Sequence, residues 1–451
     1  MTETIVALAT PNSQSALGII RVSGSMVLEL CEKSCGLPSP TPRCAHLTKY
    51  TSLEQNTLDQ IIMVYFEKGR SFTGENCMEL TCHGNPIVLE EILSDLIHRG
   101  CRLANPGEFT YRAFQNGKID LTQAEAIADL IGAKNKQALL LANKNLEGNL
   151  STKIGILQTS ILRQHSNIEA FIDFPEDDIG EEKTAQIITN LQGICSELSD
   201  LIEIGKKTDA FNRNLKVVLV GPPNAGKSSI FNKIIGMDRA IIDQEPGTTR
   251  DFIDYNTNLG KVSIQLYDTA GIRETDQEIE RQGIERTYEL IKDADLVLVV
   301  LDRFQPYPTI IDHEIKNSVK DKKSILILNK SDLQNNINIA GSYLEEIPKT
   351  EVSVTNEESI LNLTSQITSC LLEDSLVDNE FNLSVNLRQS NALSKALVYI
   401  QNSIENIKTE ETIEFAIPDL KESISLLGEI VGNKDNEDML DLLFSNFCIG
   451  K

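Results

Sequence analysis

The chain has 451 residues, of which 41% are hydrophobic and 24% charged, an ordinary balance for a globular protein and enough length for about three domains. The formal net charge of −24 excludes a broad basic surface, so we expect no DNA partner, and RNA contact only through a local basic surface or a partner protein. No apolar run is long enough to cross a membrane, the N-terminus lacks a basic signal region, and nine cysteines suit reduced thiols; we therefore expect a cytoplasmic protein without membrane partners.

Residues 1–118 are predicted to form a mixed, strand-rich domain. Short apolar runs separated by Gly, Pro and Asn predict strands over Thr4–Ala9, Leu17–Val22, Gln60–Phe66 and Met78–Cys82. One helix is predicted over Ile87–His98, because its apolar residues repeat at helical spacing and Gly100 follows them.

Residues 119–213 change to a helical period, in which Leu121, Ala124, Ala128 and Ile131 share one face. A break at Phe174-Pro175 separates two helical stretches within this region. The helical pattern returns in residues 374–451, after a compact segment over residues 214–373. We therefore predict one discontinuous helical domain with an α/β domain inserted into it.

A phosphate-binding loop is predicted at residues 221–228, where the sequence GPPNAGKS follows the apolar run Leu215–Val220. Gly221 and Gly226 allow the backbone to turn its amide groups toward a phosphate. Lys227 would contact the β- and γ-phosphates, and the Ser228 hydroxyl would bind Mg²⁺.

Further GTPase elements follow in the expected order. Asp268-Thr269-Ala270-Gly271 ends a strand-like run and suits Mg²⁺ and γ-phosphate contacts, and Thr249, within residues 247–251, suits a second Mg²⁺ position. Asn329-Lys330-Ser331-Asp332 follows the buried strand Ile325–Leu328, and the carboxylate of Asp332 would accept two hydrogen bonds from guanine that adenine cannot donate. Ser353-Val354-Thr355 is a weaker match to a base-edge loop. The sequence thus predicts a GTP-binding domain.

The residue after the D-x-x-G motif is Ile272, which cannot orient a water molecule as the glutamine of Ras-like enzymes does. Either hydrolysis is slow or another group positions the water. Asn224 and the acidic run Glu274–Glu285, which includes Glu280, are candidates.

Stretches along the whole chain resemble the MnmE (TrmE) family of tRNA-modifying GTPases. They are Gly18–Gly24, Ser71–Glu75, Pro106–Phe109, Lys118–Leu121, Gln123–Ala126, Phe171–Pro175 and the ending Phe447–Lys451. Asn85 departs from the His-Gly-Gly of many relatives, which affects the local turn only. The resemblance implies an α+β and α/β multidomain fold: a folate-binding, dimerising domain at 1–118, helical parts at 119–213 and 374–451, and a doubly wound GTPase domain at 214–373.

The family's activity adds an aminomethyl or carboxymethylaminomethyl group to the wobble uridine of certain tRNAs. The resemblance therefore implies tRNA, a homodimer, and a heterotetramer with an FAD-dependent partner (MnmG, also called GidA). The one-carbon donor would be a tetrahydrofolate derivative, 5,10-methylene- or 5-formyl-tetrahydrofolate. Its implied contacts are Arg21, Glu79, Lys118 and Lys451, although spacing alone favours Arg21 and Lys118 as surface charges. Cys448 is implied to lie near this site as a catalytic candidate.

The resemblance also implies a potassium ion in place of an arginine finger, held by Asn224, Asp243, Glu245 and Thr248, with Mg²⁺ at Ser228 and Thr249. Glu280 would orient the water indirectly. The complete set of expected GTP contacts is Asn224, Ala225, Gly226, Lys227, Ser228, Ser229, Asp243, Gln244, Glu245, Pro246, Gly247, Thr248, Thr249, Asp268, Thr269, Ala270, Gly271, Asn329, Lys330, Ser331, Asp332, Ser353, Val354 and Thr355.

Two alternatives stay open. A ribosome-assembly or RNA-associated GTPase would usually carry a basic RNA-binding module, and nothing after residue 373 is notably basic. A folate-binding scaffold that uses GTP only as a conformational switch would not need Lys227, Ser228, Thr249 and Asp268 for turnover. Neither the modified tRNAs nor the choice between glycine and ammonia as amine donor follows from the sequence.

Overall fold

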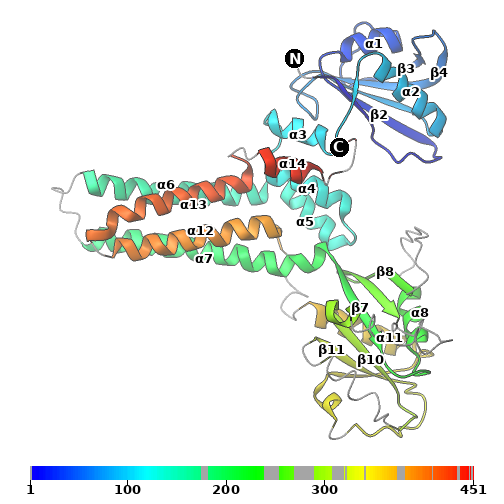
Figure 1. The fold of residues 1–451 in the computed structure, drawn as a ribbon, viewed down its shortest axis with the longest axis vertical. Helices are drawn as coiled ribbons and strands as arrows, with labels where there is room; N and C mark the ends of the chain where they lie inside the picture. Colours follow the sequence, from blue (N-terminus) through cyan, green and yellow to red (C-terminus); the bar gives the residue numbers. More distant parts are fainter. Residues whose placement is uncertain are drawn as a thin grey trace. The chain divides into compact units, whose positions relative to one another are not determined.

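The structure, a computed structural model, describes residues 3–173, 181–237, 253–268, 289–306, 319, 322–339, 342–372, 381–408, 410–433, 437–445, 447 and 450. The chain divides into two compact units, each considered by itself (Figure 1). Unit 1 comprises Met1–Ile131, Asn145–Leu198 and Asn391–Lys451, and unit 2 comprises Gly132–Lys144 and Ser199–Ser390. Within the described ranges, no helix is both long enough and apolar enough to cross a membrane.

The N-terminal part of unit 1 is built on a six-stranded sheet with the order β3-β4-β5-β2-β1-β6. The strands are β1 (Ile5–Leu8), β2 (Leu17–Ser23), β3 (Ala45–Thr51), β4 (Thr57–Phe66), β5 (Cys77–His83) and β6 (Arg102–Leu103). Neighbours pair antiparallel, except β1 and β6, which are parallel. The predicted strands are confirmed; β3, which has only one fully buried side chain, Tyr50, gave no apolar signal.

Helices α1 (Val27–Cys35) and α2 (Pro86–His98) pack on this sheet, and their apolar side chains join one core with β2, β4 and β5. The prediction of α2 is confirmed, and the side chain of Asn85 caps it by accepting a hydrogen bond from the Ile87 amide. The expectation of a single helix in this region is wrong, because α1 and α3 (Glu108–Gln115) also form. Cysteines supply part of the buried face of α1, so aliphatic residues alone under-represent its helical period.

The helical part of unit 1 comes from both sides of the inserted segment. Its helices are α4 (Leu121–Gly132), α6 (Asn149–Asp173), the first part of α7 (Glu181–Asn212), most of α12 (Leu387–Ile407), α13 (Ala416–Val431) and α14 (Glu437–Ser445), with a 3₁₀ turn, η4 (Glu410–Phe415). Figure 1 shows α6 alongside α13, and Lys153 on α6 forms an ion pair with Glu197 on α7. The predicted discontinuous helical domain is confirmed; residues 174–180, which include the expected break, lie outside the described ranges.

Unit 2 contains a second six-stranded sheet with the order β12-β11-β10-β7-β9-β8, parallel except for β8. The strands are β7 (Asn214–Val220), β8 (Ile253–Leu259), β9 (Val262–Asp268), β10 (Leu296–Asp302), β11 (Ser324–Asn329) and β12 (Lys349–Val352). The helical elements include α8 (Lys227–Met237), α11 (Glu357–Leu371) and the short η2 (Tyr343–Glu346). Apolar clusters on both faces bury the parallel strands. The doubly wound α/β domain is confirmed.

The segment before α5 (Lys136–Leu146) is fixed to the sheet of unit 2 by Asn135. Its Nδ2 donates to the Phe211 carbonyl at 2.8 Å and to Ser263 Oγ at 3.2 Å, while its Oδ1 accepts from the Ala138 amide at 2.8 Å. Leu141 joins the core beneath β7 and β9. Residues 132–144 and 199–213 also belong to this compact unit. The domain boundaries at 118/119, 213/214 and 373/374 stay predictions.

We expect Asn135→Ala to destabilise this docking by about 1–2 kcal/mol, because a helix cap and a buried hydrogen bond are lost together. Hydrogen exchange of the full chain should show faster exchange of the amides of residues 136–146. The matched control is Asn143→Ala on the exposed side of α5, whose Nδ2 donates only to the Leu139 carbonyl. Equal exchange in both variants would contradict the role of Asn135.

Candidate GTP site

The predicted phosphate-binding loop joins the end of β7 to the start of α8. Gly221 has φ 146°, and a Cβ there would lie 2.1 Å from the Val300 carbonyl oxygen. Gly226 has φ 94°, and a Cβ there would lie 2.1 Å from Asn329 Nδ2. Both positions thus require glycine, for conformation and for space. The loop therefore packs closely against the ends of β10 and β11. It leads into the N-terminus of α8, and a helix N-terminus suits an anion.

Lys227 lies inside the loop, 6% exposed, and its Nζ donates to the carbonyls of Gly221 at 2.8 Å and Pro222 at 3.0 Å. Burial lowers the pKa of this ammonium, and the Asp268 carboxylate acts in the opposite direction. Asp268 is the last residue of β9 and is 1% exposed. Ser228 and Ser229 are exposed at the start of α8. A hydroxyl and a carboxylate are the hard oxygen donors that Mg²⁺ prefers, so these residues fit the expected metal.

The loop after β11 is tied to the phosphate-binding loop. Asn329 is 1% exposed, and its Nδ2 donates to the Ala225 carbonyl at 2.8 Å. Lys330 has φ 61°, an uncommon left-handed conformation for a residue with a side chain. The amide of Ser331 donates to the Val352 carbonyl at 3.0 Å, which joins this loop to the end of β12.

Asp332 and Ser353 come together at the expected base-binding position. Ser353 Oγ donates to Asp332 Oδ1 at 2.7 Å and lies 2.8 Å from Thr355 Oγ1. This hydrogen bond is the main reason why the pKa of the Asp332 carboxyl is lowered. Asp332 is exposed, so its ionised carboxylate is available to a ligand. The weak sequence match at Ser353-Val354-Thr355 therefore lies beside the base-selecting carboxylate.

Several expected residues lie outside the described ranges. They are Asp243, Gln244, Glu245, Pro246, Gly247, Thr248, Thr249, Thr269, Ala270, Gly271, Glu280, Cys448 and Lys451. Asn224, the described member of the expected potassium set, is exposed with φ 63° and presents an amide oxygen of the kind that binds hard cations. Asp302, the last residue of β10, was not predicted; its Oδ2 lies 2.6 Å from Lys330 Nζ, and the register of β10 with β11 places it there.

In unit 1, Arg21 and Glu79 lie opposite each other on β2 and β5. Glu79 Oε1 accepts from Arg21 Nε at 2.9 Å and lies 2.8 Å from a second guanidinium nitrogen. The guanidinium carbon lies 5.8 Å from the ring centroids of both Phe72 and Phe109, and a third nitrogen lies 3.4 Å from the Gly450 carbonyl. The structure thus brings together two of the expected folate contacts and the carbonyl of Gly450. Spacing alone gave no sign of this pairing.

Lys118 does not join that pair; its Nζ donates to the Gly69 carbonyl at 2.9 Å. The loop from Gly69 to Glu75 connects it indirectly to Arg21, because Phe72 belongs to the same loop. Asn116 strengthens this link by donating to the Thr73 carbonyl at 2.7 Å.

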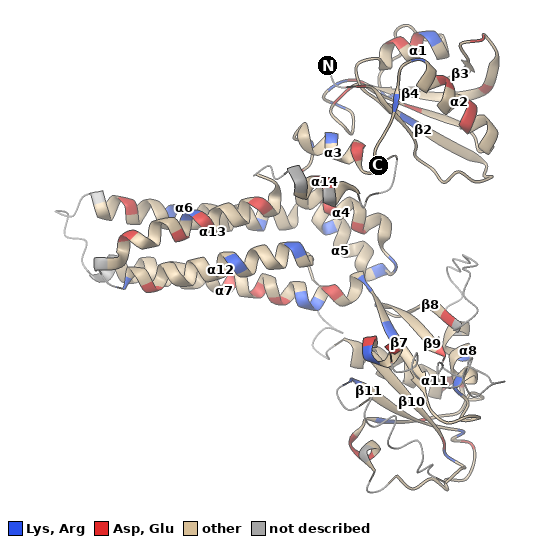
Figure 2. Cartoon of the chain, in the orientation of Figure 1, with Lys and Arg blue, Asp and Glu red and all other residues tan. Residues whose placement is uncertain are grey.

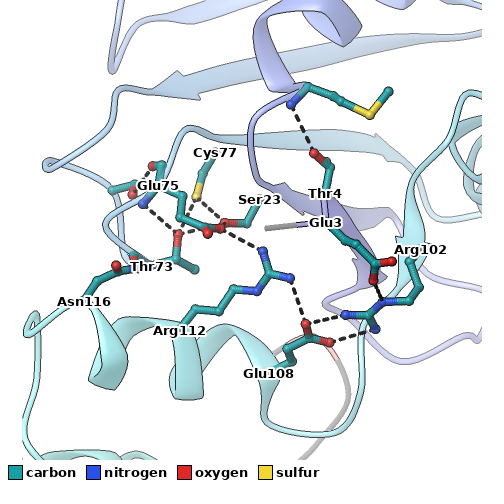
Figure 3. A network of polar contacts seen from close by, with 12 residues as sticks. Glu3, Thr4, Ser23, Thr73, Glu75, Cys77, Arg102, Glu108, Arg112 and Asn116 are labelled. Carbon is teal, nitrogen blue, oxygen red and sulfur yellow. Dashed lines mark hydrogen bonds and ion pairs between the residues drawn. The ribbon is translucent and has the colours of Figure 1, made fainter. Parts of the chain in front are cut away.

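A network of charged side chains centred on the buried Arg112 links the same loop to α3 (Figure 3). Arg112 donates to Glu75 at 2.9 Å and to Glu108 at 2.8 Å, and Arg102 donates to Glu108 at 2.6 Å. Burial alone would raise the pKa of Glu108, but hydrogen bonds from Arg102, the Asn105 amide and Arg112 together lower it. The loop that carries Phe72 is therefore held rigidly against the helix that carries Phe109.

Comparison with known proteins gives matches along the whole chain. The family described as the MnmE helical domain matches residues 121–448, and the family described as the GTP-binding protein TrmE N-terminus matches residues 4–118. The "tRNA modification GTPase MnmE" of Aquifex aeolicus is 39% identical over 456 residues, covering 100% of each chain. Those of Opitutus terrae and Thermotoga maritima are each 36% identical, over 449 and 463 residues, covering 100% of this chain and 99% and 100% of the relatives.

Asp332→Asn should lower the affinity for GDP by roughly a hundredfold or more, because the variant loses an acceptor for the guanine N–H groups and faces them with a donor. The same amide donor suits the C2 carbonyl of xanthine, so the affinity for xanthosine diphosphate should rise. Titration with fluorescent derivatives of both nucleotides measures the two changes. Unchanged preference for GDP would show that Asp332 does not select the base.

Proposed function

Because the chain belongs to the MnmE (TrmE) family of tRNA modification GTPases, we propose that it is a potassium-dependent GTP hydrolase that modifies the wobble uridine of certain tRNAs. It acts with an FAD-dependent partner and adds an aminomethyl or carboxymethylaminomethyl group, using a one-carbon unit from a tetrahydrofolate derivative. The observation that carries the GTPase part is the meeting of the phosphate loop, Asp268 and the 329–332 loop at one edge of a parallel sheet.

In the GTP site, Ser228, Thr249 and Asp268 would hold Mg²⁺, which would neutralise negative charge on the phosphates. Asn224, Asp243, Glu245 and Thr248 would hold potassium, whose positive charge would stabilise the negative charge that develops on the phosphates. Lys227 contacts the same phosphates, and the buried position of this lysine supports that role, since few water molecules compete for its ammonium. Glu280 would orient the attacking water indirectly, a function that Ile272 cannot perform.

In the folate site, Arg21, Lys118 and Lys451 meet the carboxylates of the ligand and Glu79 accepts from its pterin ring. Both described contacts of Arg21 with Glu79 fall on Oε1, which supports Oε2 as the atom that accepts from the pterin. The rings of Phe72 and Phe109, each with its centroid 5.8 Å from the guanidinium carbon, support Arg21 as a fixed cation. We assign Cys448 to this site, as a thiol that takes part in the modification or shapes its site.

The assembly that we propose is a cytoplasmic homodimer joined through residues 1–118, which forms a heterotetramer with the FAD-dependent partner MnmG. The helical domain at 119–213 and 374–451 carries the GTPase domain at 214–373. Mass spectrometry of wobble uridine from cells that lack this protein tests the function. Unmodified uridine, restored to the modified form by the intact gene, is the expected result; normal modification in the deletion strain would exclude it.

We expect GTP turnover to be faster in KCl than in NaCl of equal ionic strength, by on the order of tenfold or more, because the cation replaces an arginine finger. Asn224→Ala should abolish this stimulation while the preference for guanine over adenine nucleotides is retained, since that preference depends on Asp332. Initial rates of phosphate release measure both. Equal turnover in the two salts would remove potassium from the mechanism.

Cys448→Ser should abolish wobble modification and leave potassium-stimulated GTP hydrolysis near the wild-type rate, because the two activities belong to different domains. The matched control is Cys44→Ser, which changes an exposed thiol of the N-terminal domain. Modified uridine in tRNA and GTP turnover are measured on the same preparations. Full modification by the Cys448 variant would assign the thiol a packing role, and loss of both activities would indicate misfolding.

A further inference from the structure

An ion pair next to the candidate base-binding loop has no part in the function described above. Asp302, the last residue of β10, lies in register with Asn329, the last residue of β11. Its Oδ2 accepts from Lys330 Nζ at 2.6 Å, and its Oδ1 accepts from the Phe304 amide at 2.9 Å. Both carboxylate oxygens are therefore engaged, one with its own strand end and one with the neighbouring loop.

The burial of the two partners is unequal. The Asp302 side chain is 8% exposed and the Lys330 side chain is 38% exposed. A carboxylate this deeply buried is costly without a hydrogen-bonded cation, so the pair favours one position of the lysine strongly. The buried Asp302 therefore determines the position of the more exposed Lys330.

The backbone conformation of Lys330 is unfavourable and requires a stabilising contact. It has φ 61°, which disfavours a residue with a Cβ by roughly 1 kcal/mol or more. It lies between Asn329, which is bonded to the phosphate loop, and Asp332, which is bonded to Ser353. A change in Lys330 therefore displaces the two groups on either side of it.

We propose that Asp302 is a positioning residue for guanine nucleotide binding: through its ion pair with Lys330 it holds residues 329–332 in the conformation that receives the base. The inference rests on the proposed GTP-binding function. Asp302 acts through Lys330 and contacts no described residue of the phosphate loop. Because a preformed loop loses less conformational freedom on binding, the effect falls on nucleotide affinity and not on the chemical step.

The effect of a substitution on the affinities for different nucleotides distinguishes the proposed role of Asp302 from that of Asp332. A residue that fixes the loop as a whole affects every purine nucleotide that uses Lys330 in the same way. Asp332 is expected to accept from both N1–H and the exocyclic amine of guanine, so its loss weakens GDP by more than it weakens inosine diphosphate, which keeps N1–H. Inosine diphosphate, which lacks that amine, distinguishes the two roles.

The test uses the full chain and the variants Asp302→Asn, Lys330→Met and the double variant, with fluorescent GDP and unlabelled inosine diphosphate as probes. Asp302→Asn keeps the acceptor for the Phe304 amide and removes the charge. We expect it to weaken GDP and inosine diphosphate by the same factor, about tenfold, through faster dissociation. The kcat at saturating GTP should stay within about twofold of wild type while KM rises.

The double variant should bind GDP no more weakly than Lys330→Met does, because Asp302 cannot position the loop once its cation is gone. The matched control is Glu351→Gln, which removes the neighbouring ion pair of Arg303 with Glu351, 2.8 Å long and 55% exposed on the glutamate side. We expect this control to change GDP affinity by less than about twofold.

Unchanged GDP affinity in Asp302→Asn would overturn the inference. So would a double variant whose loss of affinity is the product of the two single losses, or a fall of kcat accompanied by a fall of the melting temperature. Failure of the wild-type protein to bind GDP would instead refute the proposed GTPase function. Loss of GDP binding with normal binding of inosine diphosphate would also contradict the inference, because it would assign Asp302 to recognition of the amine.

Discussion

The parallel pairing of β10 with β7 on one side and β11 on the other is the constraint on which the candidate GTP site depends. Parallel strands begin their following loops at the same edge of the sheet, so distant segments of the chain meet there. The register sets Val299 opposite Val220 and Asp302 opposite Asn329. A slip of one residue would turn each of these side chains to the other face. The close approach of Gly221 to the Val300 carbonyl is a direct consequence of this register.

In the N-terminal sheet, antiparallel pairing brings together the residues of the candidate folate site. Arg21 and Glu79 form a cross-strand pair because β2 and β5 are in register there, and α3 and the 69–75 loop enclose the guanidinium. The ion network of Arg112 with Glu75 and Glu108 fixes these two elements to each other (Figure 3). Buried charges of this kind contribute little net stability, but removal of one partner is costly. The network therefore favours one geometry over alternatives more than it stabilises the fold.

The sequence was sufficient for elements whose chemistry is local. The phosphate loop, Asp268 and the 329–332 loop follow strands with continuous apolar character, and α2 has a clear helical period, so each was predicted. α1 was missed because Cys31 and Cys35 form part of its buried face, and β3 because most of its side chains are not buried. Asp302 and the pairing of Arg21 with Glu79 depend on strand register, which no short motif encodes. Lys118 was expected with Arg21, but its ammonium bonds to Gly69.

Charge gives the two candidate sites a common feature. The chain carries a net charge of −24, yet both expected ligands, GTP and a folate, are anions. In the part of the chain that the structure describes, carboxylates lie close to the cations of these sites: Lys330 pairs with Asp302, and Arg21 pairs with Glu79. Burial lowers the pKa of Lys227, and the Asp268 carboxylate partly offsets this effect. Figure 2 shows how sparsely the basic residues are distributed. Long-range attraction of anions by such a surface is weak, so association depends on short-range contacts. Backbone amide groups at the start of α8 add positive potential that the net charge does not cancel at close range. The carboxylates then have a structural use: they fix where each cation lies, and a cation that is already in place loses little side-chain entropy when an anion binds.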